Sequence, residues 1–420
     1  METFDITAIL ITLAAAFAYL NYRYIKLPTT IGIMLMSLVV ALLIILFGSS
    51  SGFLTNTAHQ IIAGIDFNEV LMEGMLCFLL FAGALHVNLN DLANQKFIIL
   101  LMATIGVIIS TAIVGLGSFY LLQTLSLNIP LIHCLLFGAL ISPTDPVAVL
   151  GILKKAGVPK SLETKITGES LFNDGVGVVV FITILKVATH QEELSTHLIL
   201  HEFAVEALGG IAFGIALGAI GFYLIKSIDN YQVEVLITLA IVTGGYSLAM
   251  ALHISGPLAM VVAGLMIGNH GRSLAMSQAT RKRLDVFWEL VDEVLNAVLF
   301  VLIGLELLIV QWTPTALVAG LLAIPLVLAA RLIAVTTPVG FLRFFRPFEP
   351  GTVRMLTWGG LRGGISVALV LALPQNPERD LFLTMTYLVV VFSIAVQGLT
   401  LKRLAHSIQK DSSPPAPTPP

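Results

Sequence analysis

The charged side chains that could bind an ion occur inside long apolar runs. Three of them are acids, Asp145, Glu169 and Asp174, and two are bases, Arg331 and Arg362. If these runs cross a bilayer, each charge costs at least about 2.5–3.5 kcal/mol at the bilayer centre. Each is therefore a candidate for function.

A polar stripe follows the expected helix over residues 168–188. Ser170, Asn173 and Asp174 share one face of this helix, and Glu169 lies at its edge. Carboxylate, hydroxyl and amide oxygens are ligands for hard cations. Asp174 is the only full negative charge on the face and has no basic neighbour in the sequence, so a cation and a proton could compete for it. The alternative is a buried polar network that only fixes helix packing.

Proline interrupts the expected helix over residues 130–153. Residues 142–146 read Ser-Pro-Thr-Asp-Pro, so two backbone donors are missing and the carbonyls of Ala139 and Ser142 lose their helical partners. At membrane depth such carbonyls are tolerated where they line a polar cavity or bind a ligand. Asp145 before a proline also predicts the start of a second half-helix. We favour a substrate-facing break over a simple proline kink.

A second interruption lies at residues 359–364, which read Gly-Gly-Leu-Arg-Gly-Gly. A buried guanidinium is costly unless it is paired, so Glu169 is the expected partner of Arg362. The alternative for Arg362 is a water-filled vestibule. Arg331 could neutralise a helix terminus or gate a pathway, and the sequence leaves both readings open.

Other titratable residues are weaker candidates. Asp292 and Glu293 are expected to begin the tenth crossing, where acids stabilise the helix dipole. The remaining weak candidates are expected at or near helix ends: Glu73, His86, His253 and Glu306.

The composition places all these residues in a membrane protein. Of 420 residues, 57% are hydrophobic and only 11% are charged, with a mean hydropathy of +0.95. Soluble domains carry about 25% charged residues, so a soluble enzyme, a nucleic-acid binder and a disordered scaffold are excluded. Cys77 and Cys134 lie in apolar runs, so neither a disulfide framework nor a metal-spaced Cys cluster is expected.

Apolar runs of sufficient length predict about thirteen transmembrane helices. They span residues 5–21, 30–48, 69–88, 97–122, 130–153, 168–188, 203–225, 232–252, 256–269, 289–310, 315–342, 353–373 and 381–401. With this count, eighteen of the 22 Lys and Arg residues fall on one side and only Lys186 and Arg379 on the other. Because basic residues mark the cytoplasmic side, we expect the N-terminus outside and the C-terminus in the cytoplasm.

The two interrupted helices are the fifth and the twelfth of this series. Paired broken helices are typical of transporters with internal repeats. Seven crossings separate them, and an odd number predicts inverted six-helix repeats with crossed discontinuous helices. Residues 1–403 are the expected transport domain and residues 404–420, rich in proline and serine, a disordered cytoplasmic tail. No nucleotide-binding glycine loop occurs in the sequence, which disfavours ATP-driven pumping.

Four motifs together resemble the NhaP/NHE-type monovalent cation/proton antiporters. They are residues 142–149 (SPTDPVAV), 168–175 (GESLFNDG), 255–259 (SGPLA) and 360–364 (GLRGG). The resemblance covers residues 5–403, and it implies thirteen helices and a homodimer whose core domains move against a dimerisation domain.

The resemblance also implies a role for each site residue. Asp174 matches the carboxylate that binds the ion and the proton, with Ser170 and the main chain of Thr144 as cation ligands and Asn173 as the supporting amide. The remaining charges match structural positions: Asp145 the acid of the unwound helix, Glu169 and Arg362 an ion pair, and Arg331 the arginine of the eleventh helix.

One position departs from the family pattern. Many members carry an acid in the third helix, within a motif resembling Leu-Phe-Glu-Ala, whereas residues 80–85 here read Leu-Phe-Ala-Gly-Ala-Leu. Ala82 stands at that position, which bears on cation selectivity and affinity.

Together these patterns predict a secondary antiporter in the plasma (inner) membrane. It would exchange Na⁺ or Li⁺ for H⁺, one for one and electroneutrally, because Asn173 leaves a single carboxylate to cycle. K⁺/H⁺ exchange at the same site and a cation channel are the alternatives. Neither an enzymatic activity nor a cofactor is expected.

Overall fold

The structure is a computed structural model that describes residues 3–47, 69–156, 158–189, 196–308, 310 and 312–412. All regular elements within these ranges are helices. Eight helical segments of this part are long and apolar enough to cross a membrane, among them Thr29–Phe47 and Pro314–Leu342. The chain is therefore a multi-pass, all-helical membrane protein.

The helices follow the expected segments closely. Their bounds are α1 (Thr3–Leu20), α2 (Thr29–Phe47), α4 (Leu76–His86), α5 (Leu89–Leu101), α6 (Val107–Thr124), α7 (Leu131–Ile141), α8 (Val147–Ala156), α9 (Lys160–Thr189), α10 (Thr196–Lys226), α11 (Tyr231–Ala251), α12 (Gly256–Met266), α13 (Arg272–Leu274), α14 (Gln278–Leu305), α15 (Pro314–Leu342), α16 (Thr352–Trp358), α17 (Gly364–Leu371), α18 (Pro377–Phe392) and α19 (Leu399–Ser412). Each of the thirteen expected crossings overlaps one helix or a consecutive pair among them. The number of crossings and the inverted repeat stay predictions.

Both expected interruptions are present. Residues 142–146 separate α7 from α8, and residues 359–363 separate α16 from α17. The prolines of the first segment cannot donate to the preceding turn, and the glycines of the second favour a non-helical backbone. The prediction of two broken helices is confirmed.

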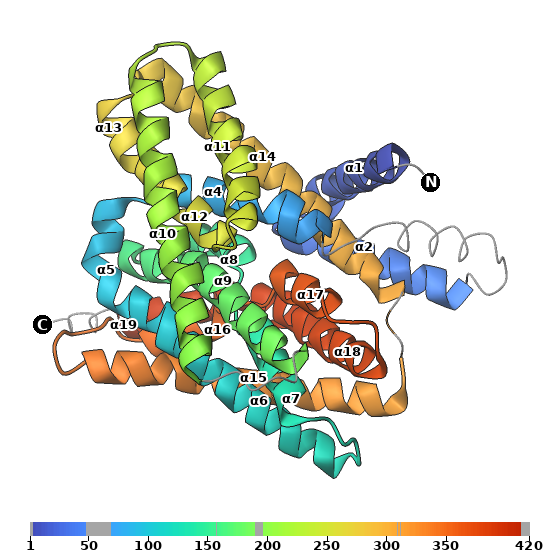
Figure 1. Cartoon of the computed structure of the whole chain (residues 1–420). Helices are drawn as coiled ribbons and strands as arrows, with labels where there is room; N and C mark the ends of the chain where they lie inside the picture. The colour runs from blue at the N-terminus through green and yellow to red at the C-terminus, as the bar shows by residue number, and fades with distance from the viewer. Residues whose placement is uncertain are drawn as a thin grey trace, which may run out of the picture.

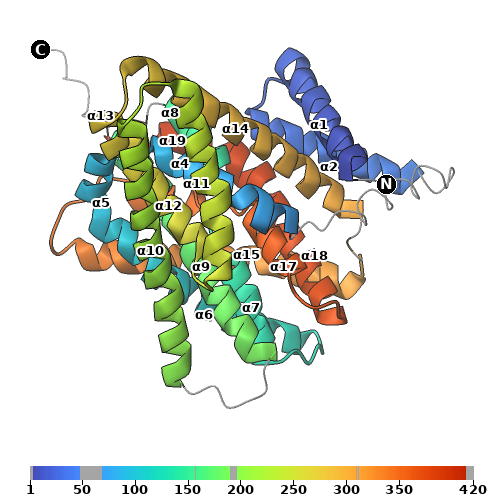
Figure 2. The same ribbon diagram turned by 45° about the horizontal axis from the view of Figure 1, so that its top comes forward.

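The packing brings the broken helices to the middle of the molecule. α7 packs against α6, α9 and α17, whereas α10, α11 and α12 form a separate group against α4 and α9. α1 and α2 lie against α14 at one side, in both views (Figures 1 and 2). Helices from distant parts of the sequence therefore surround the two interruptions.

Several boundaries differ from the expected ones, and those of α14 and α19 differ the most. α14 begins at Gln278, well before residue 289, because Ser277 caps it through a hydrogen bond from the Thr280 backbone N–H. α19 continues to Ser412, so residues 404–412 are helical and the expectation of disorder is wrong for them. The hydrophilic composition of this segment gave no sign of a helix, but α19 packs against α8 and α16. Residues 413–420 lie outside the described residues.

Candidate ion-binding site

The unwound segment between α7 and α8 is fastened to α9 by three polar side chains. The Thr144 and Ser170 hydroxyl oxygens lie 3.0 Å apart, and the Asn173 amide Nδ2 donates to Thr144 Oγ1 at 2.8 Å. The Asn173 Oδ1 also accepts from the Thr144 backbone N–H at 3.3 Å. All three residues are buried. Asn173 thus holds Thr144 in place through both ends of its amide.

Asp174 is one residue further along α9, and its side chain is buried beside this network. Only 6% of the residue is exposed, and Oδ1 has no hydrogen-bond partner among the described residues. A buried polar atom without a protein partner is uncommon in folded proteins, and a bound ion or proton at Asp174 would account for it. Asp174 lines a cavity of about 1150 Å³, so an ion could reach it.

Asp145 lies where the two interruptions meet. Its backbone N–H donates to the Leu361 carbonyl at 2.8 Å, and a Cβ on Gly363 would come within 2.3 Å of its Oδ2. Only glycine allows this approach. The Asp145 carboxylate therefore lies close to the N-termini of both α8 and α17, where a negative charge opposes the positive ends of the helix dipoles.

Arg362 lies where the two interruptions meet, at the C-terminal end of α7. Its Nη1 donates to the carbonyl oxygens of Ser142 at 2.5 Å and Pro143 at 2.9 Å, and its backbone N–H donates to Ser393 Oγ. These carbonyls end α7, so a positive charge meets the negative end of that helix. The Ser142 carbonyl that proline leaves without a helical partner is therefore bound by Arg362.

Glu169 was expected to pair with Arg362, but in the structure its partner is Arg331. Arg331 of α15 binds Glu169 with both terminal nitrogens, through Nη1 to Oε1 and through Nη2 to Oε2 at 2.8 Å. Its Nη2 and Nε also donate to the Leu356 carbonyl near the end of α16. A flat guanidinium can satisfy a carboxylate and a carbonyl at once, as this position requires.

The Arg331 guanidinium needs space beside the second interruption. A Cβ on Gly360 would lie 2.4 Å from Arg331 Nε, so this glycine makes room for the ion pair. Arg331 therefore stabilises the C-terminal end of α16, in agreement with one of the two roles that the sequence left open. Arg331 and Glu169 join α9, α15 and α16.

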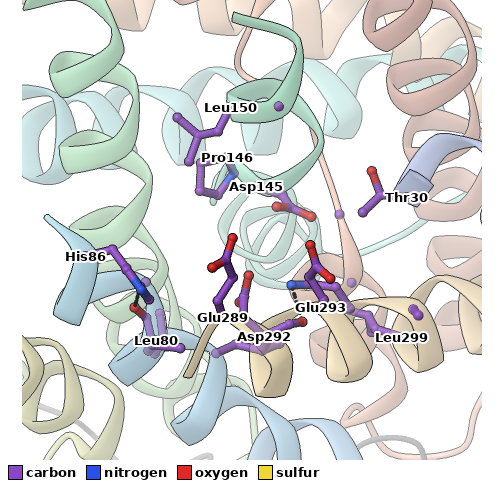
Figure 3. Close-up of a pocket in the computed structure, with 18 of the residues that line it drawn as sticks. Thr30, Leu80, His86, Asp145, Pro146, Leu150, Glu289, Asp292, Glu293 and Leu299 are labelled. Atoms are coloured by element: carbon purple, nitrogen blue, oxygen red, sulfur yellow. Dashed lines mark hydrogen bonds between the residues drawn. The ribbon is translucent and has the colours of Figure 1, made fainter. Parts of the chain in front are cut away.

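Four acids of α14 line the same cavity as Asp145 and Asp174: Asp285, Glu289, Asp292 and Glu293. Figure 3 shows the Glu289 and Glu293 carboxylates extending from α14 toward Asp145. The expectation that Asp292 and Glu293 stabilise a helix start is wrong, because α14 begins at Gln278. The sequence contained a signal, since residues 289 and 293 are four apart and share a helix face.

The weaker candidates divide into three groups. His86 lines the cavity together with Ala82, whose carbonyl oxygen is 2.8 Å from His86 Nδ1. His253 and Glu306 are not among the described residues that line it. The Glu73 side chain lies outside the part of the chain that the structure describes.

A family comparison decides the class of protein. The family described as "Sodium/hydrogen exchanger, transmembrane" matches residues 10–406. The chain belongs to this family. Its resemblance to the cation/proton antiporters, inferred from four motifs, is confirmed.

Individual relatives agree with the family assignment. The Na(+)/H(+) antiporter NhaP of Pseudomonas aeruginosa is 51% identical over 410 residues, which cover 96% of each chain. The Na(+)/H(+) antiporter NhaH of Halobacillus dabanensis is 34% identical over 396 residues, which cover 92% of this chain and 93% of the relative. The solved structure of the sodium proton antiporter MjNhaP1 from Methanocaldococcus jannaschii superposes with a TM-score of 0.74 at 19% identity, over 97% and 99% of the two chains. This likeness shows the fold.

Proposed function

We propose that this protein is a secondary active antiporter that exchanges Na⁺ or Li⁺ for H⁺ by alternating access. The observation that carries the proposal is the buried Asp174 carboxylate, with an oxygen that no described protein donor satisfies, on the wall of a large acidic cavity. The relatives' names support sodium over potassium as the cation. Nothing specific in the site favours a cation channel.

In this proposal Asp174 holds either a proton or the cation. A monovalent cation would take oxygen ligands from Asp174, from the Ser170 hydroxyl and from the main chain of Thr144, while Asn173 keeps Thr144 in position. When Asp174 is protonated, its charge is neutralised and the main attraction for the cation is lost. This mutual exclusion couples the two flows.

The other charges of the site have fixed roles in the same proposal. Asp145 offsets the N-termini of α8 and α17, and Arg362 offsets the C-terminal end of α7. Glu169 and Arg331 neutralise each other. A single carboxylate then changes its charge in each cycle, which gives electroneutral exchange of one cation for one proton.

The membrane arrangement is part of the proposal. The distribution of basic residues supports a plasma-membrane protein with its N-terminus outside and its C-terminus in the cytoplasm. Residues 1–403 form the transport domain. Two copies form a homodimer, as the family resemblance implies. Transport rather than a covalent reaction is the activity.

Exchange in everted membrane vesicles tests the proposal. Asp174→Asn should abolish the Na⁺-driven recovery of a quenched pH dye, whereas Asp229→Asn, the same substitution at an exposed position, should keep the wild-type rate. Addition of Na⁺, Li⁺ and K⁺ in turn identifies the cation. Imposed membrane potential should leave the wild-type rate unchanged. Wild-type exchange in Asp174→Asn would overturn the assignment of this residue, and a potential-dependent rate would overturn electroneutrality.

A further inference from the structure

A second cavity, of about 430 Å³, lies beside the acidic one and has the opposite charge. The two cavities share His86, Val87 and Asn88 at the end of α4. The charged or titratable side chains among the described residues lining the second cavity are all of the basic type: His86, His270, Arg272 and Arg281. Its volume falls within the range of about 300–1,000 Å³ that is usual for small-molecule sites.

A polar clamp fixes one wall of this cavity. The Asn269 amide Nδ2 donates to the Val87 carbonyl at 2.9 Å, and its Oδ1 accepts from the Leu89 backbone N–H at 2.8 Å. Nδ2 also donates to the Leu265 carbonyl at the end of α12. The link between α4 and α5 is thereby held against the π-helix Ile267–Gly271 that follows α12.

The two arginines on the other wall keep unused hydrogen-bonding capacity. Arg272 pairs with Asp285 through Nη2, and Arg281 donates through Nη2 to the Arg272 carbonyl. The Nε of each is buried and has no hydrogen-bond partner among the described residues. Arg281 makes no ion pair with any residue that the structure describes. Both guanidinium groups line the cavity and keep N–H groups that no described residue accepts from.

We propose that this basic cavity is a binding site for a phosphate-bearing anion. A guanidinium presents parallel N–H groups that match two phosphate oxygens, and the cavity wall supplies two such groups together with two imidazoles. The anion is either free phosphate or the phosphate of an anionic lipid headgroup. Because the site shares residues 86–88 with the acidic cavity, an anion bound there lies next to the proposed cation path.

Thermal unfolding of the full-length protein in detergent tests the site without measuring transport. One arm adds sodium phosphate against sodium chloride at equal ionic strength. The other adds dihexanoyl-phosphatidylglycerol against dihexanoyl-phosphatidylcholine. Saturating anion should raise the wild-type unfolding midpoint by about 2 °C or more. A shift with phosphate identifies the free anion as a ligand, and a shift with the glycerol lipid alone identifies the headgroup; both support the site.

Two variants and a matched control assign the shift to the cavity. Arg281→Gln should lose the anion-dependent shift, and Arg281→Lys, which keeps the charge without the guanidinium fork, should keep part of it. Lys282→Gln removes a positive charge from the exposed neighbouring position and should respond like the wild type. Absence of a shift in the wild type, or an equal loss in Lys282→Gln and Arg281→Gln, would overturn the proposal. These outcomes are independent of whether Asp174 exchanges ions.

Discussion

The backbone N–H of Asp145 donates to the carbonyl oxygen of Leu361 at 2.8 Å, although 216 residues separate the two in the sequence. This bond joins the two interrupted helices, main chain to main chain. It places an acid between two helix N-termini, while Arg362 binds the carbonyls that end α7. Where the two interrupted helices meet, the helix-end charges are thus offset by Asp145 and Arg362, which belong to the interruptions themselves.

The partner of Glu169 can be tested with double-mutant cycles. Arg331→Met leaves a buried carboxylate unpaired and should destabilise the protein by about 3–5 kcal/mol. Adding Glu169→Gln should recover much of this loss, so the coupling energy should be large. The same cycle for Glu169 and Arg362, whose described side chains form no hydrogen bond with each other, should give the smaller coupling energy. Denaturant or thermal unfolding in detergent measures both, and the reverse order of couplings would contradict the structure.

The contribution of Arg362 to stability should come mainly from its hydrogen bonds to the Ser142 and Pro143 carbonyls, not from pairing with an acidic side chain. Arg362→Leu leaves the Ser142 and Pro143 carbonyls unsatisfied, at about 1–3 kcal/mol each. Arg362→Lys should be less harmful, because an ammonium group still opposes the end of α7. Arg343→Leu, at an exposed position after α15, is the matched control and should change the unfolding midpoint little. If Arg343→Leu and Arg362→Leu lowered the unfolding midpoint equally, Arg362 would not stabilise the end of α7 as described.

The close approach at Gly363 predicts a strong effect of one methyl group. Gly363→Ala would bring its Cβ within 2.3 Å of Asp145 Oδ2, so the crossing must shift. We expect exchange in vesicles to fall at least about tenfold, since misplacement by about 1 Å at a functional site can have a hundredfold effect. Gly340→Ala in α15, with no atom within 4 Å of the added Cβ, should keep normal exchange. Normal exchange in Gly363→Ala would show that the contact can relax.

Glu349, in the loop before α16, predicts a pH-dependent contribution to stability. Burial raises its pKa, but hydrogen bonds from Lys165 and Ser161 outweigh this effect and lower the pKa from 4.5 to about 2. A folded-state pKa below the unfolded one stabilises the protein above about pH 4.5, and this stabilisation is lost as the pH falls from about 4.5 toward 2. Because 38% of the Glu349 side chain is exposed, we expect solvent screening to limit the effect to about 1 kcal/mol.

Glu349→Gln isolates this contribution. The wild-type unfolding midpoint should exceed that of the variant at pH 7, and the difference should shrink between pH 5 and pH 3. Other carboxylates titrate in both proteins and cancel in the comparison. A constant difference across this pH range would show that the Lys165 pairing does not depend on the charge of Glu349.

Local features of the site were predictable from the sequence, and its long-range partners were not. The prolines of residues 142–146 and the glycines of residues 359–364 dictate where helices stop, and the spacing of Ser170, Asn173 and Asp174 dictates a shared face. By contrast, 162 positions separate Arg331 from Glu169. Either arginine could electrostatically have neutralised Glu169, and only the packing of α15 against α16 determines which one does.

The position of the α14 acids was missed for a different reason. An apolar run indicates where a helix crosses the hydrocarbon, but the helix itself can extend further at either end. Capped by Ser277, α14 begins at Gln278, eleven residues before the expected start of the crossing at residue 289. The acids then fall within the helix and turn toward the cavity.

The Asp174 oxygen that lacks a protein partner bears on the speed of the proposed cycle. Because no described donor holds Oδ1, a proton and a cation can replace each other there without breaking a hydrogen bond inside the protein. The Asn173–Thr144 contacts do not involve the Asp174 carboxylate, so the proposed exchange does not require these contacts to break in each turnover. The main local barrier is then the removal of water from the incoming ion.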